Sequence, residues 1–587
     1  APSSVTPRLK VLCVVHNTIK AGSFGGLEIH QDLVAKNLQG HYDFYFFFSI
    51  DHGEGRKFIF AGPDYEPIEF AVSSVKNFHG MLENSLVERF FSQCLVKYSI
   101  DLVHFYHFIN NVPSLVHIAK AIDRKVVISI HDFYIACRSF NLLDASDRYC
   151  ANSQARLDAC DSCLQQKYKF PYGSQLKRRE YYGRALCAAD SVIFMSESTS
   201  AIMHDIYPEL FLHKNKRIHG APLPDMPNAS LMSSNSQKER MPKKGEMLEI
   251  CALGHMTLHK GGIYLEKALK ETKAKSFRIH FHGGMDQNIK TRIQKVLGDR
   301  AVFHGAYKPG SLDISLYDFS LHLSMWPETY CQTLSQAWAA GVVPIVTNIG
   351  ALGERVTQGV TGIKVNYLDP AELARTLDEI CENPDRYLAF RKNFHPGLFL
   401  DQRTHSSMYK EAYEQVIGEE APKSLISTSA KGAGFDMDSI SARARSISWN
   451  GGTAPHQKDE LIVPSKSERG IRRELVDAAS YKRLKLGGDE TLSVADDLNT
   501  NGELLLKNGK AISLKGVIKL KGKEQVRKLC PVAVITSDSD ARLVYVSELQ
   551  KKEVVSKGDI EVTGEVGLLS PTVMIQGRAR ISLGLIS

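Results

Sequence analysis

The stretch SMWPETYCQTLSQAWAAGVVPIVTNIGALGERV, residues 324–356, decides the fold of this 587-residue chain. It predicts a strand that ends near Ser324, a loop that carries Glu328, a helix that starts near Gln332 and a second strand that begins near Val343. A buried strand that leads through a polar loop into a helix, and then into another buried strand, is typical of an α/β domain with a parallel sheet.

The start of the predicted helix has the properties of an anion-binding site. The backbone N–H groups of Thr333 and Leu334 fall in its first turn. Unpaired donors and the helix dipole favour a phosphate at that position. Glu328 stands in front of the same helix, where a carboxylate can bind sugar hydroxyls. These residues therefore predict a ligand that contains both a phosphate and a sugar.

Short apolar strands alternate with helical segments on both sides of this stretch. The predicted strands of the first half span residues 11–16, 45–49, 102–107, 126–131 and 191–196, and those of the second half span 249–254, 277–283, 301–306, 319–324 and 343–348. Such alternation indicates parallel sheets covered on both faces. We predict an α/β fold with two Rossmann-like domains, whose facing strand ends form a cleft.

The length and the local composition suggest several domains, because one hydrophobic core does not extend over so long a chain. We expect an N-terminal Rossmann-like domain, a C-terminal Rossmann-like domain, helices that cross back to the first domain, a linker rich in Ser, Gly, Ala and charge, and a β-rich module in which Asn508-Gly509 marks a hairpin. These parts are assigned to residues 1–225, 245–395, 396–418, 419–470 and 471–587.

The overall composition is that of a globular protein, with 43% hydrophobic and 24% charged residues. No run of about 18 apolar residues occurs, and the eleven cysteines mostly lie singly in apolar stretches. We therefore expect a cytoplasmic protein. The net charge of +8 favours anionic partners such as sugar nucleotides or lipid phosphates, and nucleic acid is not expected. Residues 167–184 mix cations with aromatic residues, which fits either a solvated helix face or a peripheral contact with the inner face of the membrane.

The decisive stretch resembles the family 4 retaining glycosyltransferases of GT-B fold. That family carries a Glu, seven residues, a second Glu, an Ala-Gly-x-Pro-like step and an Ile-Gly-Ala-x-x-Glu turn. The two positions are Glu328 and Gln336 here, so the second carboxylate is replaced by an amide that still forms hydrogen bonds but carries no charge. The resemblance implies that Glu328 contacts the donor sugar and that Gln336 holds the ribose hydroxyls.

The resemblance extends over residues 8–418 and includes two glycine motifs. Gly25-Gly26, after the first predicted strand, resembles the family's Gly-Gly loop, where a missing Cβ allows close approach of the donor phosphate or the acceptor. GHMTLHKGG, which begins at Gly254, resembles its phosphate-binding turn and implies that Lys260 is the cation on the diphosphate.

His131-Asp132 completes the resemblance at the end of the strand VVISIH. It matches the position where the family places a histidine beside the reacting sugar, so we expect His131 to be catalytic together with Glu328.

The resemblance implies transfer of a sugar from a UDP-, GDP- or dTDP-sugar to a glycan, lipid-linked or protein acceptor, as in the biosynthesis of polysaccharides or glycoconjugates. No cofactor is expected for catalysis, because the Rossmann-like region carries no Asp-x-Asp metal motif. Two alternatives remain open. One is a sugar-nucleotide epimerase of the same architecture, and the other is an inactive pseudo-glycosyltransferase that serves as a scaffold or sensor.

One cysteine cluster stands apart from the single thiols. It consists of Cys137, Cys150, Cys160 and Cys163, all in the insert after His131. Two cysteines separated by two residues can bind one zinc ion, and two further thiolates can complete a tetrahedral structural site. The alternatives are four unrelated thiols or a labile disulfide.

Overall fold

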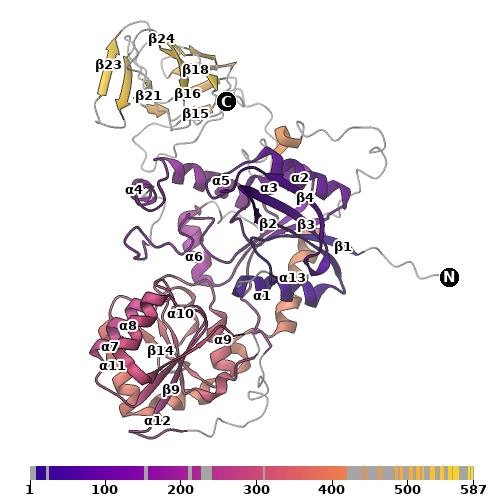
Figure 1. Cartoon of the computed structure of the whole chain (residues 1–587). Helices are drawn as coiled ribbons and strands as arrows, with labels where there is room; N and C mark the ends of the chain where they lie inside the picture. Colours follow the sequence, from indigo (N-terminus) through magenta and orange to yellow (C-terminus); the bar gives the residue numbers. More distant parts are fainter. Residues whose placement is uncertain are drawn as a thin grey trace, which may run out of the picture. The chain divides into compact units, whose positions relative to one another are not determined.

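The structure is a computed structural model that describes residues 8–20, 25–150, 157–208, 210, 215–225, 241–307, 311–418 and 440–444, together with the later strands named below. The chain divides into two compact units. The first comprises Ala1–Gln154 and Arg179–Gly452, and the second comprises Ala155–Arg178 and Thr453–Ser587. Both predicted Rossmann-like sheets lie in the first unit (Figure 1).

The first sheet has eight strands in the order β4-β3-β2-β1-β5-β6-β7-β8. Its strands are β1 Leu9–Val14, β2 Tyr42–His52, β3 Gly55–Ala61, β4 Pro67–Ser73, β5 Leu102–Phe105, β6 Lys125–Ile130, β7 Ser191–Phe194 and β8 Lys216–Ile218. The accompanying helices are α1 Gly26–Leu38, α2 Ser85–Lys97, α3 Ser114–Ala121, α5 Ser174–Ala188, α6 Glu197–Ile206 and the 3₁₀ helix η1 Pro63–Tyr65. Helix α4, Leu157–Tyr168, belongs to the second unit.

Two strands of this sheet depart from the predicted parallel arrangement. Strands β3 and β4 follow β2 in a meander and pair antiparallel, while β1, β2, β5, β6, β7 and β8 are parallel. The link from β2 to β3 contains only the positive-φ Gly53 and its neighbour Glu54, which is too short for a helical crossover. A short link between two strands therefore produces a hairpin at this edge of the sheet.

The second sheet is entirely parallel, with the order β11-β10-β9-β12-β13-β14. Its strands are β9 Leu248–Leu253, β10 Phe277–His282, β11 Ala301–Gly305, β12 Phe319–His322, β13 Val343–Thr347 and β14 Ile363–Val365. Its helices are α7 Gly262–Glu271, α8 Gln287–Leu297, α9 Gln332–Ala339, α10 Gly350–Arg355, α11 Pro370–Glu382, α12 Pro384–Leu388 and the 3₁₀ helices η5 Gly298–Arg300, η6 Ile314–Leu316, η7 Ala389–Asn393 and η8 Pro396–Leu398. The two sheets confirm the predicted pair of Rossmann-like domains.

Strand β1 shows why the first sheet is covered on both faces. Leu12 and Val14 belong to a buried cluster that includes residues of α2 and α3, whereas Val11 and Cys13 belong to a second cluster on the opposite face. Successive side chains of a strand point to opposite faces, so a strand with two buried faces is apolar throughout. Helix α13, Gln402–Gly418, contributes to the second cluster and packs beside α1 (Figure 1).

The later strands are β15 Leu461–Val463, β16 Arg483–Leu486, β17 Glu490–Leu492, β18 Asn501–Leu506, β19 Ala511–Lys515, β20 Ile518–Leu520, β21 Leu529–Ile535, β22 Arg542–Ser547, β23 Glu553–Lys557, β24 Ile560–Val566, β25 Ala579–Ile581 and β26 Gly584–Leu585. The expected turn at Asn508-Gly509 lies outside the described residues, and the β-rich module stays a prediction. Among the described helices, none has the length and the apolar character needed to cross a bilayer.

Helix α13 covers a group of buried histidines. His30, His104, His219 and His405 are each at most 3% exposed. Burial, followed by the repulsion of neighbouring imidazoles or of Arg217, lowers the pKa of His405 to about 3 and that of His219 to about 4, and it holds the pKa of His30 and His104 well below the ordinary value. These four rings are therefore neutral at pH 7.

Acid should destabilise the first unit through these rings. Their pKa is lower in the folded chain than in the unfolded chain, so the unfolded chain binds more protons below pH 6.5 and stability falls as the pH falls. For His405 the loss at pH 5 is about 2 kcal/mol relative to pH 7. We expect the thermal midpoint of His405→Gln to fall less between pH 7 and pH 5 than that of the wild type. An identical pH dependence in the two proteins would contradict this assignment.

Candidate functional site

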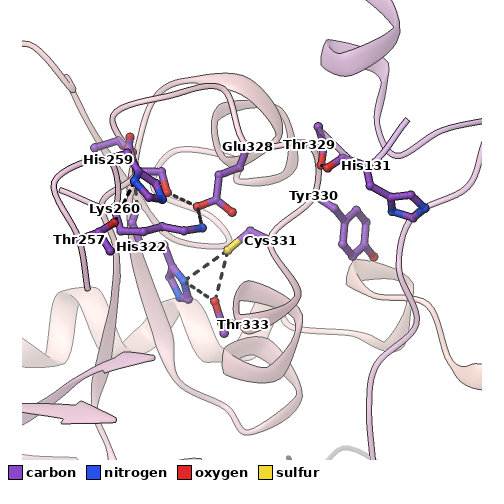
Figure 2. A network of polar contacts seen from close by, with 12 residues as sticks. His131, Thr257, His259, Lys260, His322, Glu328, Thr329, Tyr330, Cys331 and Thr333 are labelled. Atoms are coloured by element: carbon purple, nitrogen blue, oxygen red, sulfur yellow. Dashed lines mark hydrogen bonds and ion pairs between the residues drawn. The ribbon is translucent and has the colours of Figure 1, made fainter. Parts of the chain in front are cut away.

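The structure brings Lys260 and Glu328 into direct contact. Lys260 lies in the turn after β9, and Glu328 lies in the loop after β12; β9 and β12 are adjacent parallel strands, so both loops leave the same edge of the sheet. The Lys260 Nζ atom is 2.5 Å from Glu328 Oε1, and the hydroxyl of Ser324 donates a hydrogen bond to the same oxygen (Figure 2). Two residues far apart in the sequence thus form one polar centre.

Both members of this pair are charged. Burial alone would raise the pKa of Glu328 and lower that of Lys260, but the charge of the partner and the hydrogen bonds around the pair together outweigh burial, so the pKa of Glu328 is lowered and that of Lys260 is raised. The Lys260 ammonium also lies 5.6 Å from the centre of the Trp326 ring. A buried ion pair contributes little net stability, because desolvation offsets much of the attraction. Its position at the sheet edge, beside the start of α9, therefore favours a role in ligand binding over a role in stability.

Glycines shape the turn that carries Lys260. Gly254 and Gly261 adopt φ values of 93° and 86°, in the left-handed region that favours glycine. A Cβ on Gly261 would lie 2.0 Å from the carbonyl oxygen of Leu323, and a Cβ on Gly283 would lie 2.3 Å from that of Gly254. The backbone of this turn can approach its neighbours only because these side chains are missing.

Helix α9 starts at Gln332 with Cys331 at its N-cap, and no side chain caps it. The Leu334 amide donates a 3.2 Å hydrogen bond to the Cys331 carbonyl, and the Thr333 hydroxyl lies 3.3 Å from both the Cys331 thiol and His322 Nδ1 (Figure 2). Gln336 is buried further along the same helix. Thr333 and Leu334 are thus in the first turn, at the predicted place, but the Leu334 amide is paired with the Cys331 carbonyl and is not the unpaired donor that was expected. Their contact with a donor stays a prediction.

Sequence reasoning missed Cys331 and Arg355. Cys331 has a φ of 70°, unusual for a residue with a side chain, and burial raises the pKa of its thiol to about 11. Arg355 donates hydrogen bonds to the carbonyls of Tyr330 and Cys331 at 2.8 and 3.0 Å, and its guanidinium stacks 3.8 Å from the centre of the Tyr330 ring. The position of Cys331 directly before the predicted helix could have identified it as the N-cap. Nothing in the sequence indicates that the Arg355 side chain extends to the carbonyls of Tyr330 and Cys331.

His131 follows β6 in the first half of the unit. Its ring stacks on Tyr106 at 5.6 Å and meets His30 edge to face at 4.9 Å, and its Nε2 atom has no hydrogen-bond partner among the described residues. The Thr329 hydroxyl donates a 2.6 Å hydrogen bond to the His131 carbonyl (Figure 2). The residue next to Glu328 therefore joins the loop after β12 to the end of β6.

Burial keeps His131 neutral, while its neighbours keep Asp132 ionised. Burial, then repulsion by His107, lowers the pKa of His131 to about 3. Burial alone would raise the pKa of Asp132, but His107 and the Tyr134 amide together contribute to a net lowering of that pKa. Asp132 accepts hydrogen bonds of 2.8 Å from His107 Nε2 and from the Tyr134 amide. Asp132 thus stabilises its own loop through the Tyr134 amide. Its other partner, His107, was not predicted from the sequence.

The Gly-Gly loop lies against the start of α9. Gly25 is the N-cap of α1, and its amide donates a 2.7 Å hydrogen bond to Glu28 Oε2. A Cβ on Gly26 would lie 2.6 Å from Gln332 Oε1. Gly26 therefore meets the first residue of α9, which sequence reasoning did not single out, whereas Gly25 faces Glu28 of its own helix. Their contact with donor or acceptor stays a prediction.

The four cysteines of the predicted zinc site belong to different units. Cys137 and Cys150 lie in the first unit, and Cys160 and Cys163 lie on α4 in the second. Across the described part of the chain, no three His, Cys, Asp or Glu side chains converge into a group that could hold a metal ion. Structural zinc remains a prediction.

Comparison with known proteins places one family domain on this site. The family model described as "Glycosyl transferases group 1" matches residues 233–395, which contain Lys260, Glu328 and α9. No curated protein matches the chain. The match supports a glycosyltransferase domain over these residues.

Several solved structures resemble the chain at low sequence identity. Sucrose-phosphate synthase from Thermosynechococcus elongatus is 17% identical, with a TM-score of 0.48 over 70% of this chain and 100% of that one. HepE from Anabaena in complex with UDP and glucose is 16% identical, with a TM-score of 0.44 over 70% and 100%. WaaG, a glycosyltransferase involved in lipopolysaccharide biosynthesis, is 14% identical, with a TM-score of 0.44 over 69% and 98%.

Gly261→Ala should damage the site far more than a matched change elsewhere. Its Cβ would force the turn away from Leu323, whereas Gly359, with a similar φ of 71°, has no atom within 4 Å of a built Cβ. We expect Gly261→Ala to lower the stability by about 2 kcal/mol more than Gly359→Ala, measured by chemical unfolding. Equal losses would show that the close approach is not a constraint.

Cys331 offers a test of backbone strain at the start of α9. Cys331→Ala keeps a side chain in the left-handed region and loses the sulfur contacts, whereas Cys331→Gly loses the same contacts and relieves the strain. We expect the glycine variant to be the more stable of the two by about 1 kcal/mol in urea unfolding. A more stable alanine variant would contradict the left-handed geometry.

Proposed function

We propose that the protein is a retaining glycosyltransferase of GT-B type that moves a sugar from a nucleotide-sugar donor to a glycan, lipid-linked or protein acceptor. One observation carries the proposal: the contact between Lys260 and Glu328 at the edge of the second sheet, beside the start of α9. It places a cation, a carboxylate and a helix N-terminus together. A sugar diphosphate needs all three, because its phosphates are anionic and its sugar carries hydroxyls.

The charges of these residues suit the departure of a nucleoside diphosphate. As the bond between the anomeric carbon and the phosphate oxygen breaks, negative charge grows on the phosphate, and Lys260 with the first turn of α9 stabilises that charge. The positive charge on the sugar grows at the same time, as in an oxocarbenium-like state. Glu328 orients the sugar through its hydroxyls, and the neutral His131 ring lies beside the sugar as a hydrogen-bonding group.

The retained configuration follows from attack on the face that the leaving group occupies. The acceptor oxygen forms the new bond to the anomeric carbon, and its proton passes to the departing phosphate oxygen. The protein supplies no covalent nucleophile in this scheme. Because Lys260 and the helix dipole provide the positive charge, we propose that turnover does not require a divalent cation.

Turnover tests the proposal directly. The full chain is incubated with UDP-glucose, GDP-mannose and dTDP-rhamnose in buffer, where water takes the place of the acceptor, and hydrolysis of the donor is measured as release of the nucleoside diphosphate with and without EDTA. We expect one donor to be consumed equally in both conditions. Removal of the cation by Lys260→Met should lower kcat by about 100- to 1000-fold, as expected for the loss of one electrostatic group.

Lys270→Met is the matched control. Lys270 Nζ also lies 2.5 Å from a buried glutamate, Glu266, but on the exposed side of α7. We expect this variant to keep the activity of the wild type. Equal turnover in Lys260→Met and the wild type would overturn the proposed role of Lys260. An isomerised nucleotide sugar in place of free nucleoside diphosphate would identify an epimerase, and no turnover of any donor would favour an inactive scaffold.

A further inference from the structure

Helix α13 brings two polar side chains into the interior beside α1. His405 is fully buried, and so is Tyr409, one turn further along the helix. Both contact the same atom of His30 on α1: His30 Nε2 lies 3.2 Å from His405 Nε2 and 3.1 Å from the Tyr409 hydroxyl. A helix that follows the second Rossmann-like domain in the chain therefore determines the hydrogen bonding of a residue in the first.

The chemistry of neutral imidazole limits how this group can be arranged. Each neutral ring has one N–H and one lone pair, so either His30 or His405 donates through Nε2 and the other accepts. The Nδ1 atoms of both rings have no hydrogen-bond partner among the described residues. The donating ring is thus protonated at Nε2, and the accepting ring at Nδ1. Because His405 and Tyr409 approach a single atom, they determine which arrangement His30 adopts.

His30 in turn contacts His131. The two rings meet edge to face, with their centroids 4.9 Å apart and an interplanar angle of 89°. Tyr106 also stacks on the His131 ring, with the ring centroids 5.6 Å apart and an interplanar angle of 20°. Since His131 Nε2 has no hydrogen-bond partner among the described residues, packing against His30 and Tyr106 orients this ring. A change in the position of His30 is therefore transmitted to His131.

We propose that His405 and Tyr409 are positioning residues for sugar transfer, which act through His30 to orient the ring of His131. This inference rests on the proposed function, in which His131 lies beside the reacting sugar. Neither residue touches the donor in this scheme. They determine the geometry of a group that does, and small displacements of such a group can lower kcat strongly.

Kinetics of matched variants separates positioning from general stability. Tyr409→Phe removes only the hydroxyl, His405→Leu removes both ring nitrogens, and His405→Gln keeps an Nε2–H donor. We expect Tyr409→Phe and His405→Leu to lower kcat on the order of tenfold with an unchanged KM for the donor, and His405→Gln to restore most of the loss. Tyr387→Phe, which removes a buried hydroxyl bonded to Glu379 on α11, should keep the kcat of the wild type.

Two kinetic outcomes would overturn the proposal. One is an equal loss of kcat in His405→Leu and His405→Gln, which would assign His405 a purely structural role. The other is a change in the KM of the donor with kcat preserved, which would assign these residues to binding.

A second measurement does not depend on turnover. In protein labelled with ¹⁵N-histidine, the ring signals of His131, assigned with His131→Gln, report its environment and tautomer. We expect them to shift in His405→Leu and Tyr409→Phe and to stay in place in His405→Gln and Tyr387→Phe. Unchanged signals in the first two variants would refute the coupling. Absence of turnover in the wild type, by contrast, would refute the proposed function alone.

Discussion

The ion pair between Lys260 and Glu328 is the constraint around which the second domain is arranged. Each charge of this pair stabilises the other, so both groups stay ionised although they are partly buried. The adjacent parallel strands β9 and β12 direct the turn after β9 and the loop after β12 to one sheet edge, where the pair forms. Gly261 permits the close approach of the turn to Leu323. Arg355 donates hydrogen bonds to the carbonyls of Tyr330 and Cys331, in the segment that follows Glu328. The same charges are those that a sugar diphosphate would need.

The first domain contributes to this centre through contacts that are mostly neutral. Thr329 donates a hydrogen bond to the carbonyl of His131, and Gly26 lies against Gln332 at the start of α9. Buried imidazoles, uncharged at pH 7, fill the space below α13. The charged pair on one sheet and the neutral imidazoles on the other suit the proposed reaction, in which the phosphate becomes more negative and the sugar becomes more positive.

Much of this arrangement could be predicted from local sequence patterns. The apolar strands and the helix start at Gln332 follow from periodicity and from the geometry of parallel sheets. The roles of Lys260 and Glu328 at one donor site were expected only from the resemblance to GT-B glycosyltransferases. The antiparallel hairpin of β2 and β3 was missed because a short link, and not a motif, causes it. The contacts of Arg355, His107 and His405 could not be predicted, because each joins segments whose approach depends on tertiary packing.

The central claim is that the Lys260 ammonium binds the diphosphate of the donor and that the Glu328 carboxylate competes with the diphosphate for this ammonium. Calorimetric titration of UDP into the wild type, Lys260→Met and Glu328→Gln tests it most directly. The account predicts effects of opposite sign: at least about tenfold weaker binding without the lysine, and binding as tight as or tighter than that of the wild type once the competing carboxylate is neutral. If UDP binds and both substitutions weaken it equally, or if neither changes its affinity, Lys260 and Glu328 do not form the diphosphate site.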